Sequence, residues 1–318
     1  MELTKENKKI KLPKEISVLI AFAALVVIFS ILSPFFLTLR NVMNIFLYTA
    51  VIGICATGMT MIIISGGLDI SVGSMVGLTG MVSGLVVANT GNVFLAVALG
   101  LLTGLICGTI NGLVITRLKI VPIIATLAFM SIYRGTALLT TNGQSQLIAS
   151  DGFKAIGRGY IAEIVPYCVV MMFVIFIIGG YILKFTPFGR KIYSIGGNAE
   201  ASRLAGINVK NTRLAVYMIC GTLTGFSGIL TASQTGAAIP SAGSGLEMDV
   251  IGSVVLGGVS ITGGKGSIIG TFLGVMILAT LSNGLTLLNV QSFWQTIAKG
   301  IVLVIAVYID VMRGGGYE

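Results

Sequence analysis

Lys265 is the first candidate for a phosphate-binding role, because it lies in the glycine-rich stretch Gly263-Gly264-Lys265-Gly266. A phosphate-binding loop needs G-x-x-x-x-G-K-[ST], in which backbone N–H groups cradle the phosphate and the hydroxyl holds magnesium. Here Val259 stands where the first glycine is required, and Gly266 replaces the Ser or Thr. We therefore interpret the stretch as a tight turn and expect this chain not to hydrolyse ATP.

Other catalytic groups are sparse. The chain has no histidine, which removes the commonest proton shuttle and metal ligand. Its four cysteines, Cys55, Cys107, Cys168 and Cys220, lie in or beside apolar runs without metal-ligand spacing. That placement is typical of small buried side chains. The sequence shows no clustered nucleophile or acid–base pair, so it predicts a non-enzyme without catalytic residues, cofactor or metal.

The composition indicates a membrane protein. Of 318 residues, 55% are hydrophobic and 10% are charged, whereas soluble domains carry about 25% charged residues. So few charges cannot coat a globule in water. The net charge of +9 would suit nucleic acid, but the basic residues stand at the ends of apolar segments. Anchoring in a membrane explains that placement, and no nucleic-acid partner is expected.

The apolar segments predict an all-α membrane protein of about ten transmembrane helices in a single domain over residues 1–318, because about 20 apolar residues cross a bilayer. No small-residue cleavage site closes the first segment, so it is read as an uncleaved helix and not as a signal peptide. The eighth is short and glycine-rich, which leaves open a broken or re-entrant segment. The expected helices span 16–32, 45–65, 69–88, 93–116, 122–140, 163–184, 213–231, 248–262, 267–288 and 293–311.

The basic residues predict the orientation. Ten crossings place both termini on one side of the membrane. With the basic segment 1–15 in the cytoplasm, most of the 20 basic residues fall inside. The outside loops then hold only Arg40, Lys154 and Arg158, in agreement with the positive-inside rule. We therefore expect cytoplasmic N- and C-termini.

Two short motifs recur along the chain. Asp69 and Asp249 are each followed closely by Gly-Ser, and Asn111-Gly112-Leu113 recurs as Asn283-Gly284-Leu285. The offset corresponds to five helices, which reverses direction across the membrane and would mark two inverted repeats, as in many transporters. Matches this short also arise by chance in apolar sequence, so both interpretations stay open.

Glycines at i, i+4 spacing predict close helix packing. Gly100, Gly104, Gly108 and Gly112 share one helix face, and the short series Gly266, Gly270 and Gly274 shares another. Such spacing forms a groove for a neighbouring helix. We favour packing within one chain over a seam between two chains.

The longest predicted inside loop, residues 184–213, contains a short amphipathic helix. Asn198 is a suitable N-cap, and the good helix formers of Ala199–Ala205 stop at Gly206. Glu200 and Arg203 are expected to be exposed. The helix could rest on lipid headgroups or dock a cytoplasmic partner.

This loop resembles the ATPase-coupling loop of the ribose-type sugar permeases, the membrane subunits of bacterial ABC importers. The resemblance covers nearly the whole chain, from Ser33 to Asp310, in order. It is carried by Gly189-Arg190, Gly196-Gly197-Asn198-Ala199-Glu200-Ala201 and Gly206-Ile207; by Gly58-Met59-Thr60, Gly66-Gly67-Leu68-Asp69-Ile70-Ser71-Val72-Gly73-Ser74, Arg134-Gly135 and Thr141-Asn142-Gly143; and by Val255-Leu256-Gly257-Gly258, Gly263-Gly264-Lys265-Gly266 and Asn283-Gly284-Leu285.

The resemblance implies the permease subunit of an ATP-driven, binding-protein-dependent sugar importer in the bacterial inner membrane, with a pentose such as ribose as substrate. It implies three partners: a second permease subunit, identical or related; a cytoplasmic ATPase that binds ATP and Mg²⁺; and an extracytoplasmic sugar-binding protein. The implied coupling residues are Gly189, Arg190, Gly197, Asn198, Glu200, Arg203 and Gly206.

A neutral, hydroxyl-rich sugar needs hydrogen-bonding groups along its pathway. The candidates are Asn44, Thr57, Thr60, Asp69, Ser71, Ser74, Gln234 and Asn283. For each, a hydrogen bond between helices is the competing interpretation. Asp69 could equally cap the helix that follows it, since its neighbouring glycines favour a turn.

The outside loops are the candidates for docking the binding protein. The loop over residues 141–162 contains Asp151, Lys154 and Arg158, and the 232–247 loop contains Gln234 and Glu247. Long loops are often functional, although an idle solvated loop is the alternative for each residue.

Two other kinds of transporter remain open. A nucleoside or signalling-sugar permease of the same broad family would have much the same sequence features. An ion-coupled secondary transporter would need buried ionisable residues, for which Asp69, Arg134 and Lys299 are the candidates.

Overall fold

The computed structural model describes residues 14–314, so most of the basic segment predicted over residues 1–15 lies outside the described part. Its helices are α1 (Lys14–Leu32), α2 (Leu39–Ile64), α3 (Val72–Thr90), α4 (Val93–Thr116), α5 (Pro122–Leu139), α6 (Asp151–Arg158), α7 (Tyr167–Phe185), α8 (Pro187–Gly197), α9 (Ala199–Leu204), α10 (Val209–Thr235), α11 (Leu246–Leu256), α12 (Ile268–Leu287) and α13 (Ser292–Gly314). Two short antiparallel strand pairs join β1 (Gln146–Leu147) to β4 (Ala237–Ala238) and β2 (Tyr160–Ile161) to β3 (Val165–Pro166).

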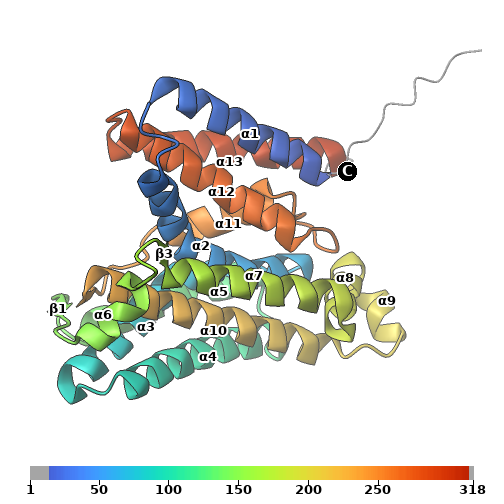
Figure 1. Cartoon of the computed structure of the whole chain (residues 1–318). Helices are drawn as coiled ribbons and strands as arrows, with labels where there is room; N and C mark the ends of the chain where they lie inside the picture. The colour runs from blue at the N-terminus through green and yellow to red at the C-terminus, as the bar shows by residue number, and fades with distance from the viewer. Residues whose placement is uncertain (1–13, 315–318) are drawn as a thin grey trace, which may run out of the picture.

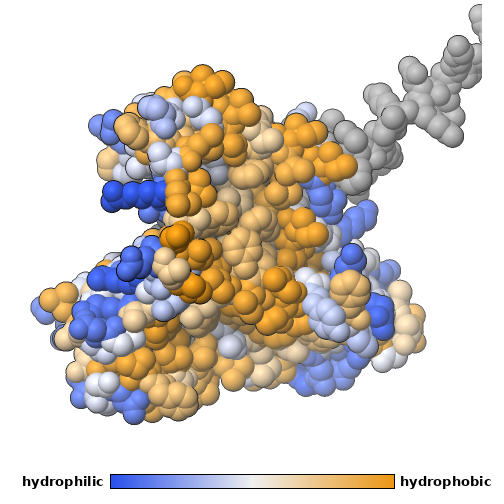
Figure 2. All heavy atoms as spheres, in the orientation of Figure 1, coloured by the Kyte–Doolittle hydropathy of each residue, from blue (hydrophilic) through white to orange (hydrophobic). Residues whose placement is uncertain are grey.

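The helices make a multi-pass membrane protein, as the composition predicts. Eight of them, α1 to α5, α7, α10 and α12, are long and apolar enough to cross a bilayer. Figure 2 shows an apolar surface across the middle of the molecule with polar residues gathered toward both ends. α11 has 11 residues and is too short to cross alone, while α13 holds only a shorter apolar stretch, Ser292–Ile305. The all-α membrane fold is confirmed, and the count of ten crossings stays a prediction.

α2 is the central helix. In Figure 1 it passes between a group formed by α3, α4, α5, α7 and α10 and a second group formed by α1, α11, α12 and α13. It packs against α7 and α10 of the first group and α11 and α12 of the second. Of the residues in the 18-residue apolar stretch of α2, 83% are buried. α2 therefore joins the two groups and carries the largest part of the core.

The glycine face of α4 packs on α10. A Cβ on Gly104 would overlap the carbonyl oxygen of Gly221, and one on Gly108 would overlap that of Tyr217. Gly270 and Gly274 of α12 approach the backbone of α11 in the same way. Packing within one chain is thus confirmed for the α4 series and for Gly270 and Gly274. Gly266 was wrongly included, because it lies in the turn before α12, at φ +147°.

The eighth predicted helix, 248–262, is broken. After α10 the chain turns back into the bundle as an irregular segment, residues 236–245, which lies along α3 and leads into α11. Arg134 of α5 donates hydrogen bonds to the carbonyl oxygens of Pro240 (2.6 Å) and Ala242 (2.8 Å). Irregular backbone at membrane depth requires such partners. The segment runs along α3, continues as α11 and reaches the turn in which Gly264 contacts the end of α2. The broken alternative is therefore confirmed, and Arg134 has a structural role in it.

Replacing Gly108 by alanine tests the α4–α10 contact. The added methyl group meets backbone atoms of Tyr217 and Gly221 that cannot move aside, so Gly108→Ala should cost about 1–3 kcal/mol of stability. Thermal unfolding of the detergent-purified protein measures this loss.

Gly135→Ala is the matched control, because no atom lies within 4 Å of a Cβ at Gly135. It should leave stability unchanged or raise it slightly, since alanine is the better helix former. Equal unfolding temperatures for the two variants would contradict the packing argument.

Candidate functional site

An ion pair lies within the membrane-spanning part of the molecule. Lys299 Nζ of α13 is 2.9 Å from Asp249 Oδ2 of α11. The hydroxyl of Tyr48, on α2, donates to the same carboxylate oxygen over 3.4 Å and accepts from Lys299 Nζ, also over 3.4 Å. Tyr48 is nine residues into α2, about 14 Å along its axis, in a hydrocarbon core roughly 30 Å thick. The cluster therefore lies near mid-membrane.

The ion pair faces a cavity of about 560 Å³. Besides the ion pair and Tyr48, the cavity is lined by Gly243, Ser244, Gly245, Leu246, Met248, Gly252, Leu278, Thr296, Gly300 and Leu303. The side chains of Asp249 and Lys299 are 18% and 22% exposed. Because charged groups are costly in contact with lipid, the open side of this cavity must face water or protein.

The cavity can bind a neutral polar solute. It offers a carboxylate, an ammonium group and a phenol hydroxyl, together with the hydroxyls of Ser244 and Thr296. The opposite charges balance, so the site provides donors and acceptors without a net charge. Apolar side chains such as Leu246 and Leu303 form the rest of the wall. This combination suits a small molecule with several hydroxyl groups.

Sequence reasoning missed Tyr48 and Asp249 as site residues. Lys299 was recognised as ionisable within a helix, and Asp249 only as part of a repeated motif. The usable signal was Asp249 itself, since an ionisable residue inside a predicted span is a functional candidate by default. Its pairing with Lys299, 50 positions away, exists only in the folded chain.

Asp69 lies elsewhere, in the turn between α2 and α3. It is fully buried and accepts hydrogen bonds from the N–H (2.9 Å) and hydroxyl (2.6 Å) of Ser71 and from Asn111 Nδ2 (3.0 Å). Ser71 is the N-cap residue of α3. Asp69 thus fixes the start of α3 and fastens it to α4, which agrees with the structural interpretation.

The other predicted pathway residues also lie away from the cavity. Thr57, Thr60 and Ser74 are buried and donate to carbonyl oxygens of their own or adjoining turns. Between α2 and α12, Thr60 and Thr271 share a 2.7 Å hydrogen bond, and the amides of Asn41 and Asn283 exchange two bonds of 2.9 Å. Asn44 is exposed and Gln234 is half-buried. Thr60 and Asn283 therefore contribute to helix–helix packing, and Thr57 and Ser74 bond to the backbone of their own helix or its cap.

The predicted docking residues divide into two groups. Asp151, Lys154 and Arg158 lie on the short helix α6, where Lys154 and Asp151 form a 2.7 Å ion pair. The hydrogen bond from Lys154 lowers the pKa of the Asp151 carboxyl. Arg158 is exposed and donates to the carbonyl oxygen of Gln234 (2.8 Å). These three residues are available at the surface.

Glu247 is not a surface residue, and its prediction as part of the dock is wrong. Only 6% of it is exposed, and it lies against Gly73 of α3. Its Oε2 has no hydrogen-bond partner among residues 14–314. The error arose because the 232–247 segment was taken for an outside loop, whereas its main part re-enters the bundle.

The predicted short helix in the 184–213 loop is confirmed as α9. Asn198 caps it by accepting the N–H of Ala201 (2.9 Å), and Gly206, at φ +83°, follows its end. Exposed Glu200 accepts from Arg203 Nε (3.1 Å), and this bond lowers the pKa of the Glu200 carboxyl. Leu204 beside them is 77% exposed, an apolar contact point that sequence reasoning did not identify.

The surface helices are joined to the core. Gly189 packs against backbone carbonyls at the end of α7, and a Cβ on Gly196 of α8 would overlap the carbonyl oxygen of Ile64 at the end of α2. That oxygen also accepts the N–H of Gly264 (2.8 Å), in the turn that follows α11. The other predicted coupling residues, Arg190 and Gly197, are exposed on α8. A displacement of α8 and α9 would therefore reach α2 and α11, the helices that carry Tyr48 and Asp249.

Comparison with known proteins identifies the family. The family described as "Branched-chain amino acid transport system / permease component" matches residues 41–307. The chain belongs to this permease family. It is 43% identical to the ribose import permease protein RbsC of Bacillus subtilis over 289 residues, 90% of this chain and 89% of that protein. It is 41% identical to RbsC of Escherichia coli K12, covering 92% of both chains, and 35% identical to the xylose transport system permease protein XylH of the same strain, covering 86% of both. No solved structure matches the permease at a significant level.

Removing one partner of the ion pair should destabilise the permease more than removing both. Lys299→Met leaves a mostly buried carboxylate without its cation and should cost about 1–3 kcal/mol. Adding Asp249→Asn removes that unpaired charge and should recover part of the loss. Thermal unfolding of the wild type, both single variants and the double variant completes the cycle. Strictly additive effects would show that the two side chains do not interact.

Proposed function

We propose that this permease is the membrane-spanning subunit of an ATP-driven, binding-protein-dependent sugar importer, with a pentose such as ribose as its substrate. The cavity around Asp249 and Lys299 is the observation that carries the proposal, since it places a charge-balanced set of hydrogen-bond donors and acceptors in mid-membrane. The relatives named for ribose, arabinose and xylose support the substrate class.

The chemistry of the cavity suits a sugar. A pentose is neutral, so a site with a strong net charge would not select it. Here the ammonium of Lys299 can donate to sugar hydroxyls, and the carboxylate of Asp249 can accept from them. The side chains already compensate each other when the sugar is absent. Binding would therefore be weak, as a pathway that must release its substrate requires.

The open side of the cavity calls for a second permease subunit. Tyr48 and Met248, beside the ion pair, are 48% and 59% exposed. Lipid against this surface would meet a charged pair, which is unfavourable. A second subunit, identical or related, would cover it and complete a water-filled pathway between the two chains.

ATP and Mg²⁺ would be bound by a separate cytoplasmic ATPase, with α9 as its docking point. Closure of the ATPase would push α8 and α9, and the contacts of Gly196 and Gly264 with Ile64 would pass the movement to α2 and α11. The cavity would then open toward an extracytoplasmic sugar-binding protein docked near α6, and hydrolysis would reset it.

The basic residues at the α8–α9 end indicate how the permease is oriented in the membrane. The surface around α8 and α9 holds Lys184, Arg190, Lys191 and Arg203, the first two turns of α10 add Lys210 and Arg213, and the turn after α11 adds Lys265. The positive-inside rule supports a cytoplasmic location for this end of the permease, in a bacterial inner membrane, and an even number of crossings would put both termini on the same side.

An uptake assay tests the function. Proteoliposomes would contain the permease with its ATPase, and radiolabelled ribose, xylose or arabinose would be supplied with the cognate binding protein. Uptake should require both ATP and the binding protein, and ribose should be the best substrate. Uptake that persists without the ATPase and follows an ion gradient would instead establish a secondary transporter, in which Asp249–Lys299 would be the coupling pair. Uptake of a nucleoside alone would place the permease in the alternative substrate class.

Replacing exposed groups of α9 tests the coupling surface. Leu204→Ser, or Glu200→Ala with Arg203→Ala, should lower ATP-driven uptake at least tenfold while the permease still folds, because these side chains have no role in the core. Leu118→Ser is the matched control, since Leu118 is 67% exposed outside α9. Copurification with the ATPase distinguishes a variant that no longer binds the ATPase from one that binds it but no longer transmits its movement. Unchanged uptake in all α9 variants would refute the coupling role.

A further inference from the structure

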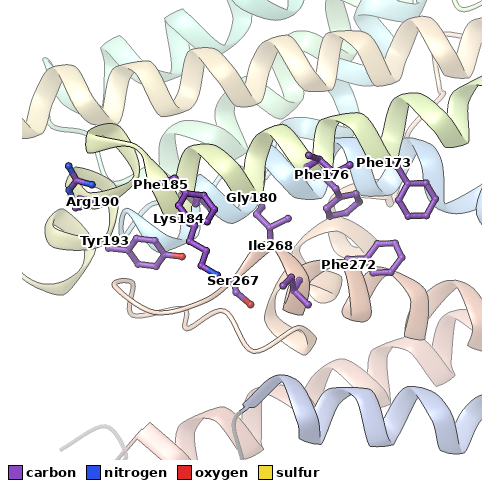
Figure 3. A pocket seen from close by; sticks show the side chains of 13 residues that line it. Phe173, Phe176, Gly180, Lys184, Phe185, Arg190, Tyr193, Ser267, Ile268 and Phe272 are labelled. Carbon is purple, nitrogen blue, oxygen red and sulfur yellow. The ribbon is translucent and has the colours of Figure 1, made fainter.

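A second cavity, a groove of about 790 Å³, lies between α7, α8 and α12. Its walls are aromatic and aliphatic along most of its length, and Figure 3 shows Phe173, Phe176 and Phe272 gathered at one end. The other end carries Lys184, Arg190, Tyr193 and Ser267. The groove is thus apolar at one end and cationic at the other.

The cationic end lies where α7 leaves the membrane. Thr186 separates α7 from the surface helix α8, and Lys184 stands in the last turn of α7. Tyr181 and Phe185 flank it and are each 61% exposed, as expected of aromatic residues at the membrane–water interface. The polar groups of the groove therefore lie at headgroup level, and its aromatic walls lie at the level of acyl chains.

The charges at this end are not used by the fold. Lys184 and Arg190 are exposed and form no ion pair with the residues whose side chains the structure describes, although Lys184 Nζ lies 5.4 Å from the ring centroid of Phe185. One carboxylate is nearby, that of Glu15, which accepts a 3.1 Å hydrogen bond from Ser267. Two cations against one carboxylate leave the mouth of the groove net positive.

We propose that this groove binds an anionic phospholipid of the leaflet that faces α8. The phosphate would lie at Lys184 and Arg190, and one acyl chain would follow Ile177, Ile269 and Phe272. A sugar does not fit the aromatic and aliphatic length of the groove, because its hydrogen-bonding groups are confined to one end. The site is also separate from the ion-pair cavity, since α12 lines the two with different faces, Ile269 and Phe272 in one and Leu278 in the other.

A lipid here would brace the surface helices. Arg190 and Tyr193 belong to α8, and Tyr193 also donates a 2.8 Å hydrogen bond to the carbonyl oxygen of Gly266, in the turn before α12. The headgroup would therefore add a link between the end of α7 and the first turn of α8, the helix that leads into α9. This inference does not depend on which solute the permease carries.

Lipid-dependent thermal stability tests the proposal. The full transport complex in detergent would be heated with added phosphatidylglycerol, phosphatidylcholine or inorganic phosphate. Phosphatidylglycerol should raise the unfolding temperature of the permease by on the order of 5 °C, because a ligand that binds only the folded state stabilises it. The other two additives should have less than half of this effect. An equal shift with phosphatidylcholine, or with inorganic phosphate, would overturn the proposal.

Two variants and a matched control locate the site. Lys184→Gln removes the principal cation, and Gly180→Leu fills the groove, where a Cβ has only Ile268 near it, at 3.9 Å. Both should lose most of the phosphatidylglycerol shift and retain less of that lipid in native mass spectrometry. Lys191→Gln, a neighbouring exposed cation of α8 that does not line the groove, should keep both. A full shift in Lys184→Gln and Gly180→Leu, or its equal loss in Lys191→Gln, would show that the groove is not the binding site.

Discussion

The absence of water from the hydrocarbon core governs this structure, because it is costly there to leave a buried polar group without a partner in the protein. The carboxylate of Asp69 is held by Ser71 and Asn111. The irregular segment 236–245 survives inside the bundle because Arg134 reaches two of its carbonyl oxygens. Where the chain exposes charge to the side, at Asp249 and Lys299, the same constraint demands a watery pathway or another subunit.

Glycine makes the bundle dense enough to meet this demand. On α4 and α12 the helix backbones approach their neighbours so closely that side chains larger than hydrogen would overlap carbonyl oxygens. In lipid, helices gain little from hydrophobic burial, so close packing and interhelical hydrogen bonds stabilise their association. The Asn41–Asn283 and Thr60–Thr271 contacts supply such bonds between α2 and α12.

α2 connects the two functional ends. Its last turn contacts α8 and the turn after α11. Tyr48, in its first half, contacts the ion pair. α11 is short and bounded by irregular segments, so it can move as a unit more readily than a full span. A change at the surface helices therefore has a direct route to the cavity through α2 and α11. The groove between α7, α8 and α12 lies beside this route, at the surface helix α8.

The sequence by itself determined the membrane class, most of the helices, the packing role of the glycine series and the capped helix after Asn198, because each depends on local composition or spacing. It also limited the residues that could carry charge inside the membrane. The hydroxyl and amide residues predicted to line the pathway were misleading. Thr57 and Ser74 donate hydrogen bonds to nearby carbonyl oxygens, and the sequence pattern cannot distinguish such bonds from contacts with a solute. Only the tertiary structure decided that Tyr48, Asp249 and Lys299 meet, and that Glu247 is buried against α3 at the start of α11. These outcomes depend on which helices become neighbours, and that is fixed by the packing of the whole bundle.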